Sequence, residues 1–228
     1  MITEADRQSS RPADRLRLAW QRRHETDYIL RFPSALGWFV ITGGGYGFYV
    51  LYQLLRRGHA HNRRRIELLD AATELAWDQA RARGLNEELR PHFERIAERA
   101  RALQELNAEF RDPALWVVLA AATLGLAQLA AWTAVDGDLA RHDDAERAIE
   151  IELAAIYSRM GAYLAAPNAS ASTPRHRARR RIAATIATAG LYAIWWVRDL
   201  MREGNDHFRD NWRFEDDLAN ASRSMLQL

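Results

Sequence analysis

Two residue types are missing from this chain altogether. It contains no cysteine and no lysine, so all 32 of its basic residues are arginine. The lack of cysteine excludes a disulfide framework, a thiolate metal site and a thiol nucleophile. The complete use of arginine in place of lysine is typical of a GC-rich bacterial genome. We interpret it as source composition rather than as phosphate recognition.

A strong charge of one sign is also missing. The formal net charge is +2, which argues against nucleic acid as a partner. The few serines lie in linkers and tails, without a base and an orienting group beside them. The glycines at positions 43–45 lie in an apolar stretch and lack the Lys-Ser/Thr of a P-loop. We therefore expect no enzyme and no cofactor.

Charged residues are absent from three stretches, although the mean hydropathy of the whole chain is −0.38. The stretches are Pro33–Leu55, Pro113–Val135 and Ile182–Val197. A helix that crosses the bilayer core needs about 20 residues. The first two blocks are long enough to cross, whereas the third is shorter and would need Arg181 and Arg198 to reach the headgroups. Burial of all three blocks as core helices of a soluble protein is the alternative.

The three blocks share a register. Each contains a threonine with a glycine two positions later, and a histidine follows each threonine at one constant spacing. The threonines are Thr42, Thr123 and Thr188, the glycines Gly44, Gly125 and Gly190, and the histidines His61, His142 and His207. Units one and three also match without gaps at Tyr46/Tyr192, Gly58/Gly204 and Arg63/Arg209. The chain is therefore predicted to be a three-fold internal repeat. The sequence match is firm between units one and three and weaker for unit two.

Each block is followed by apolar residues at helical spacing, and no segment alternates at period two. We predict an all-α integral membrane protein with three pseudo-repeated units, each an apolar (transmembrane or re-entrant) helix plus a solvent-exposed amphipathic helix. The expected parts are a basic tail with an interfacial helix (1–32), unit one (33–112, with apolar block 33–55 and polar helices 62–111), unit two (113–165, with block 113–135 and polar helix 141–164), a linker with a basic run (166–181) and unit three (182–228, with block 182–197).

The charges beside the blocks leave two interpretations open. Arginines flank the first and third blocks on both sides, whereas a spanning helix should show an excess on one side only. Each block could instead dip into the bilayer as a re-entrant hairpin that turns at Thr-x-Gly. Backbone groups at a turn that faces lipid would go unsatisfied, so such a turn must be buried against other segments. We favour spanning or strongly embedded helices. We assign helix packing or a turn to Thr42, Gly43, Gly44, Gly47, Thr123, Gly125, Thr188 and Gly190.

The register-matched histidines are the best candidates for a site that the sequence offers. If the three units pack around a pseudo-three-fold axis, the imidazoles of His61, His142 and His207 could converge on a metal ion or a proton. The alternative is that histidine is one of several polar residues tolerated at headgroup level, about two turns beyond each apolar block.

One stretch carries a family resemblance. The run Thr188-Ala-Gly-Leu-Tyr-Ala-Ile-Trp-Trp, with Arg-Glu-Gly-Asn at 202–205, resembles a family of small bacterial membrane proteins of unknown function. The hallmark of that family is an apolar T-x-G-x-Y-x-x-x-W helix followed by a polar R-E-x-N-like turn, with Leu-Asn where this chain has Gly204-Asn205. The run that starts at Thr42 is similar, and the run at Thr123 keeps only the first positions. The resemblance implies a membrane location and no activity.

These observations predict a non-enzymatic, membrane-embedded scaffold or assembly subunit of the bacterial cytoplasmic (inner) membrane. Its partners would be the lipid bilayer and other membrane proteins or copies of itself, with the charged helices at 62–111 and 141–164 projecting toward them. Two alternatives are a small transport or proton-conducting membrane protein that uses the three histidines, and a soluble helical interaction module.

Overall fold

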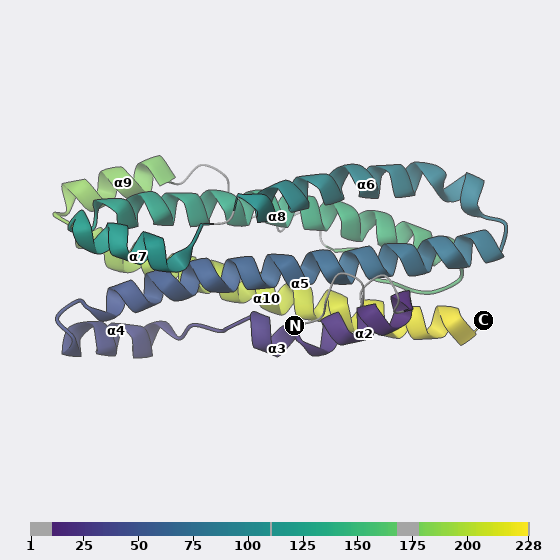
Figure 1. The fold of residues 1–228 in the computed structure, drawn as a ribbon, viewed down its shortest axis with the longest axis horizontal. Coiled ribbons are helices and arrows are strands. Elements are labelled where there is room, and N and C mark those ends of the chain that lie inside the picture. The colour runs from purple at the N-terminus through teal and green to yellow at the C-terminus, as the bar shows by residue number, and fades with distance from the viewer. Residues whose placement is uncertain (1–10, 110, 168–177, 228) are drawn as a thin grey trace.

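The computed structural model describes residues 11–109, 111–167 and 178–227, and every regular element in these ranges is a helix. The predicted all-α class is confirmed. Three long helices run side by side in the same direction, namely α5 (Tyr46–Ala82), α8 (Leu126–Arg159) and α10 (Tyr192–Gln227) (Figure 1). With a rise of 1.5 Å per residue, each is about 50 Å long.

A ten-residue helix precedes each long helix and folds back along it. These short helices are α4 (Phe32–Ile41), α7 (Pro113–Ala122) and α9 (Ala178–Ala187). All three pairs lie at the same end of the bundle, on the left in Figure 1, which we call the hairpin end. A turn therefore splits each uncharged block, and the continuous helices that the sequence favoured do not form. Among the described residues, no helix combines the length and the apolar character needed to cross a membrane.

The three hairpin turns have the same backbone conformation. The residue after each threonine lies in the left-handed region, with φ of 55°, 50° and 48° for Gly43, Leu124 and Ala189. The next residue is always a glycine, with φ of 97°, 92° and 93° for Gly44, Gly125 and Gly190. Two successive left-handed residues end a helix sharply, and glycine adopts this conformation without a steric penalty. The Thr-x-Gly pattern is therefore a turn signal in all three units.

The threonine hydroxyl satisfies backbone groups on both sides of each turn. Thr42 Oγ1 donates to the Trp38 carbonyl at 2.8 Å and accepts from the Tyr46 amide at 2.8 Å. The same pair of bonds recurs at Thr123 and Thr188, at 2.7–2.9 Å. A turn placed in lipid has no water to bond these groups. The sequence led us to expect that such turns would be buried against other segments, and this expectation is wrong, because Thr42, Thr123 and Thr188 are exposed. The threonine hydroxyls satisfy part of the backbone of each turn instead.

The other end of the bundle, which we call the far end, adds three helices to the second halves of the long ones. These are α2 (Pro12–Gln21), α3 (Arg23–Thr26) and α6 (Asn86–Ala108). The interfacial role expected for the N-terminal helix is wrong, because Leu16 and Ala19 of α2 are buried in the bundle core. Residues 1–10 of the predicted tail lie outside the described part of the chain.

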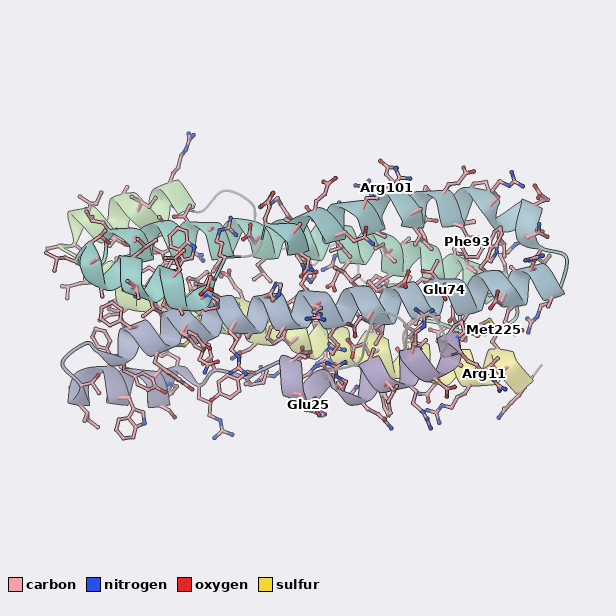
Figure 2. The ribbon with its side chains drawn as sticks, viewed as in Figure 1. Arg11, Glu25, Glu74, Phe93, Arg101 and Met225 are labelled. Atoms are coloured by element: carbon pink, nitrogen blue, oxygen red, sulfur yellow. The ribbon has the colours of Figure 1, made fainter. Side chains whose placement is uncertain are left out.

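The amphipathic helices fold against each other instead of projecting to partners. Gly84 (φ 70°) closes the turn between α5 and α6, which then packs along α8. The ring of Phe93 on α6 lies against Trp77 of α5, with centroids 5.0 Å apart, whereas Arg101 on the same helix points outward (Figure 2). The projection expected of 62–111 and 141–164 is therefore corrected: their apolar faces form the far-end core.

Two apolar cores lie along the bundle. One belongs to the hairpin end and includes Leu51, Trp132 and Trp196, and the other belongs to the far end and includes Leu68 and Ile149. The long helices carry buried histidine, arginine and glutamate side chains between these cores. The molecule thus has a polar layer at mid-length, which contains the candidate site.

The predicted linker at 166–181 is shorter than expected. Its residues 168–177 lie outside the described part of the chain, and α9 begins at Ala178. Arg181 of the predicted basic run is therefore helical. It is buried and ion-paired with Asp136 at 2.7 Å and Glu203 at 3.0 Å, so it joins unit two to unit three.

Candidate functional site

The three register-matched histidines meet at mid-length of the bundle. His61 on α5, His142 on α8 and His207 on α10 are all buried. Their ring centroids form a nearly equilateral triangle, 5.5 Å for 61–142, 5.2 Å for 61–207 and 5.5 Å for 142–207. The long helices start at the same end and run in parallel, so residues at one spacing from each turn reach the same level. The convergence expected for a pseudo-three-fold packing is present in the structure. The alternative was that each histidine is tolerated as a polar residue about two turns beyond its apolar block; the structure shows instead that the three rings pack against one another inside the bundle.

A second layer lies one helical turn further along the same helices. The residues four positions after the histidines are Arg65, Glu146 and Asn211. Glu146 accepts from Arg65 Nε at 2.7 Å through Oε1 and from Asn211 Nδ2 at 2.8 Å through Oε2. Sequence reasoning missed this layer. An extension of the histidine register by one turn of a helix would have found it.

Carboxylates fix the orientation of two of the rings. His61 Nδ1 donates to Asp27 at 2.9 Å, and His207 Nδ1 donates to Asp143 at 3.2 Å. Because an ionised carboxylate only accepts, each Nδ1 carries the proton and each Nε2 keeps a free lone pair. Asp27 is itself held by Arg64 at 2.9 Å and by the Trp212 indole at 2.7 Å. It follows α3 in the chain, outside the repeat, so no register could have indicated it.

The Nε2 atoms of all three rings lie near the Glu146 carboxylate. The separations from Nε2 to the nearer carboxylate oxygen are 3.2 Å for His142, 3.4 Å for His207 and 4.0 Å for His61. One ligand atom from each of these four residues lies within 4.8 Å of the others. Neither ring nitrogen of His142 makes a hydrogen bond, although the side chain is buried. Three imidazoles and one carboxylate are a donor set suited to a transition metal.

A buried ion-pair network surrounds the cluster. Arg65 contacts Glu146, Glu150 at 2.5 Å and Glu215 at 3.2 Å, with its side chain 0% exposed. Arg64 pairs with Glu215 at 2.8 Å as well as with Asp27. Charges that are removed from water are tolerated only when they are paired and hydrogen-bonded. Arg65 links unit one to carboxylates of units two and three, and Arg64 links it to unit three and to the N-terminal segment.

The pKa values in the cluster are shifted in different directions. Burial lowers the pKa of His61 to about 3, although Asp27 opposes the shift. Burial would also lower the pKa of His207, but its hydrogen bond to Asp143 and the charge of Glu146 outweigh burial and raise it. The charge of Arg65 outweighs burial and holds the pKa of Glu146 well below its usual value. At neutral pH, Glu146 is therefore ionised and His61 is neutral.

A cavity of about 120 Å³ adjoins the histidines on the side of the hairpin end. All three histidines line it, together with an apolar ring from the three long helices formed by Leu54, Val135 and Leu200. This volume is enough for several water molecules, since one water needs roughly 10–15 Å³ of such space. The cluster thus has Glu146 on one side and an open space on the other.

The Arg-Glu-Gly-Asn stretch of the family resemblance is not a turn but a part of α10. Arg57 of α5 lies against it and donates to the carbonyls of Leu200 and Met201 at 3.2–3.3 Å. A Cβ on Gly204 would lie 2.5 Å from Arg57 Nη2, so any larger residue there would push the guanidinium away from its hydrogen bonds. Asn205 Oδ1 accepts a hydrogen bond from Arg57 at 2.7 Å, and the Asn205 side chain also forms two hydrogen bonds with the backbone amide and carbonyl of Leu30. These residues tie unit three to unit one beside the cluster.

The hairpin end exposes a broad apolar surface. Leu124 at the tip of the second hairpin is 97% exposed, and Ile41 and Ile186 beside the other two turns are 73% and 72% exposed. Further large apolar side chains are exposed on the same hairpins: Trp38, Phe39, Val40, Leu115, Val118, Leu119, Leu126, Leu191 and Trp195. No charged residue occurs in 32–55, 113–135 or 182–197. A contiguous apolar surface of this kind marks a contact site with a membrane or another protein.

Comparison of the chain with protein-family models, curated proteins and solved structures finds no match. The class is therefore defined by fold and site: an all-α bundle of three hairpin units with a buried histidine cluster and an apolar end. The resemblance to the family of small bacterial membrane proteins stays a prediction.

Proposed function

We propose that the protein is a non-enzymatic, membrane-embedded scaffold or assembly subunit, held in one leaflet of the bacterial cytoplasmic membrane by its three hairpins. The single observation that supports the proposal most strongly is the uncharged, exposed apolar surface of the hairpin end. Exposure of such a surface to water is unfavourable by a free energy of roughly 25 cal/mol per Å² of apolar area. Acyl chains remove that cost.

The length of the hairpins supports insertion into one leaflet. Helix α4 has ten residues, so the hairpin reaches about 15 Å from Arg31, which is half of the roughly 30 Å hydrocarbon core. On the returning helix, the first charged residue is Arg56, ten residues after Tyr46. Arg31 and Arg56 therefore lie at about the same depth, and both are exposed. Arginines at this level would contact anionic headgroups.

The scaffold role goes one step beyond membrane attachment. The far end carries exposed charged helix faces, for example Arg90, Arg95 and Arg101 on α6. With the hairpins in lipid, these faces would point away from the bilayer. They would be available to membrane-protein partners or to a second copy of the chain.

Flotation with lipid vesicles tests the membrane proposal. We expect the purified chain to float with vesicles of phosphatidylcholine and phosphatidylglycerol. We expect the triple variant Val40→Glu, Leu124→Glu, Ile186→Glu to stay at the bottom of the gradient, because three carboxylates would have to enter hydrocarbon.

The matched control places three glutamates at exposed apolar positions away from the hairpins, with Leu18→Glu, Ile151→Glu and Tyr163→Glu. These residues are 41%, 40% and 86% exposed, and this variant should float like the parent chain. Equal flotation of both variants, or a parent chain that does not bind vesicles, would overturn the proposal and favour the soluble interaction module.

A small transport or proton-conducting protein is the second candidate, and the convergence of the three histidines favours it. Reconstituted vesicles that carry a pH-sensitive dye test this role. Proton flux that depends on His61, His142 and His207 would support it, and flux equal to that of empty vesicles would end it.

A further inference from the structure

The strongest unexplained feature of the polar layer is that its acceptor atoms point at one another. Asn211 Nδ2 has two hydrogens but three acceptors within 3.3 Å, namely Glu146 Oε2, His61 Nε2 and His207 Nε2. The rings cannot turn these nitrogens away, because Asp27 and Asp143 hold the opposite nitrogens. When all three imidazoles are neutral, at least one lone pair therefore lacks a donor among the described residues. A cation between the rings and Glu146 would satisfy all of them.

His142 adds an independent observation. Its side chain is only 9% exposed, and neither ring nitrogen makes a hydrogen bond. Buried polar nitrogens without a partner are rare in folded proteins. The Nε2 atom nevertheless lies 3.2 Å from Glu146 Oε1, on the same side as the other two Nε2 atoms. The ring is thus placed as a ligand that lacks its ion.

The distances fit a metal coordination sphere. Bonds of about 2.0–2.1 Å from a tetrahedral metal to nitrogen and oxygen place neighbouring ligand atoms about 3.3–3.4 Å apart. Glu146 Oε1 lies 3.2 Å from His142 Nε2 and 4.0 Å from His61 Nε2, and Glu146 Oε2 lies 3.4 Å from His207 Nε2. A shift of well under 1 Å in the His61 ring would bring its separation into this range. One ligand atom from each of the four residues lies within 4.8 Å of the others, so the ligands must move closer together around an ion.

The charge of the network also calls for a cation. Five buried or nearly buried carboxylates contact the cluster or its arginines: Asp27, Asp143, Glu146, Glu150 and Glu215. The guanidinium groups paired with them belong to three residues, Arg64, Arg65 and Arg147. Among the described residues, this network therefore has more carboxylates than guanidiniums, and it surrounds the three rings with groups that favour a cation.

The surrounding groups match those of a histidine metal site. A ligating imidazole normally donates its second ring N–H to a carboxylate, which fixes the tautomer and orients the ring. Asp27 and Asp143 do this for His61 and His207. Imidazole nitrogens select transition metals over calcium and magnesium, which prefer oxygen ligands.

We propose that His61, His142 and His207, through Nε2, and Glu146, through a carboxylate oxygen, bind one divalent first-row transition-metal ion of the zinc or cobalt type. Each unit of the repeat contributes one histidine, and unit two also supplies the carboxylate. The ion locks α5, α8 and α10 together at mid-length. The adjoining cavity leaves room for water beside the ion.

Titration of the full chain in mild detergent with Co²⁺ tests the proposal, with protein purified without a histidine tag and stripped with a chelator. We expect one Co²⁺ per chain, with the intense visible absorption of a four- or five-coordinate ion, and displacement by Zn²⁺. His142→Phe keeps an aromatic ring and removes both nitrogens, which have no hydrogen-bond partner among the described residues. Loss of an outer-shell partner typically costs 10–100-fold in metal affinity, so loss of this ligand should weaken binding by at least about 100-fold.

The matched control is His92→Gln. His92 is also paired with a glutamate, Glu152 at 2.6 Å, but on the surface of the far end. This variant should bind Co²⁺ like the parent chain. Circular dichroism of the metal-free His142→Phe protein checks that its helices are intact, and Asp143→Asn, which keeps all four ligands, should show an intermediate loss. A parent chain without stoichiometric Co²⁺, or a His142→Phe protein with parental affinity, would overturn the proposal. Vesicle flotation would be unaffected by either result.

Discussion

At the hairpin end, leucine and isoleucine side chains such as Leu124 and Ile186 face outward, and no charged residue occurs in 32–55, 113–135 or 182–197. About 30 Å further along the same long helices, Arg64 and Arg65 are buried among carboxylates and histidines. In most globular proteins large apolar side chains are buried and charged side chains are exposed, and both regions show the opposite. An exposed apolar surface is stable only when something outside the chain covers it, whereas buried charges are stable only when the chain pairs them. The hairpin end therefore depends on its surroundings, and the polar layer depends on its own partners.

The largest expected effect comes from breaking the pairing in the polar layer. Arg65→Met removes the cation that contacts Glu146, Glu150 and Glu215. Because it leaves buried carboxylates without compensation, we expect it to lower the free energy of unfolding by about 3–5 kcal/mol. Chemical denaturation followed by circular dichroism measures the change.

Arg63→Met is the matched control for that variant. Arg63 lies two residues earlier, with a side chain 58% exposed and one surface pair with Glu67. Its replacement should cost less than about 1 kcal/mol. Similar losses for both variants would mean that the buried network does not stabilise the bundle.

The register-matched glycines should respond in opposite directions. Gly204→Ala places a Cβ against the Arg57 guanidinium, and we expect a loss of about 1–3 kcal/mol from overpacking. Gly58→Ala meets nothing within 4 Å in the interior of α5, so the better helix propensity of alanine should stabilise the chain by about 0.5–1 kcal/mol. Thermal unfolding midpoints of the two variants test this pair. A stabilising Gly204→Ala would show that Arg57 does not pack there.

The smallest expected effect concerns the hairpin turns. Thr123→Val removes the hydroxyl that donates to the Leu119 carbonyl and accepts from the Ala127 amide. We expect a loss of about 1 kcal/mol, larger in lipid than in detergent because lipid offers no replacement partner. Thr133→Val is the control, since its hydroxyl only donates to a carbonyl within α8. Equal stability of the two variants in lipid would show that the turn threonine has no special role.

The sequence predicts more of the polar layer than of the hairpin end. The helical class follows from the apolar periodicity, and the shared spacing from Thr to His predicts that His61, His142 and His207 reach one level. The break inside each apolar block was not the favoured interpretation, because the uncharged runs 33–55 and 113–135 are also long enough to span a bilayer. The signal for the break was already present as Thr-x-Gly, whose second left-handed position favours glycine.

Other residues of the cluster do not show up as identical residues of the repeat. Arg65, Glu146 and Asn211 occupy equivalent positions but are chemically different, so a search for identical residues passes over them. Asp27 comes from a non-repeated segment, and only the packing of the N-terminal helices against α5 and α10 brings it to His61.

The absence of cysteine from the chain permits the most direct measurement of membrane depth. A single cysteine at Leu124 or at Tyr163 can carry a spin label, because both positions are exposed. With vesicle-bound protein, we predict that the label at 124 is accessible to oxygen and shielded from a water-soluble nickel chelate, at a depth near the bilayer centre. The label at 163 should show the reverse. Equal access of the nickel chelate to both labels would contradict insertion of the hairpin end.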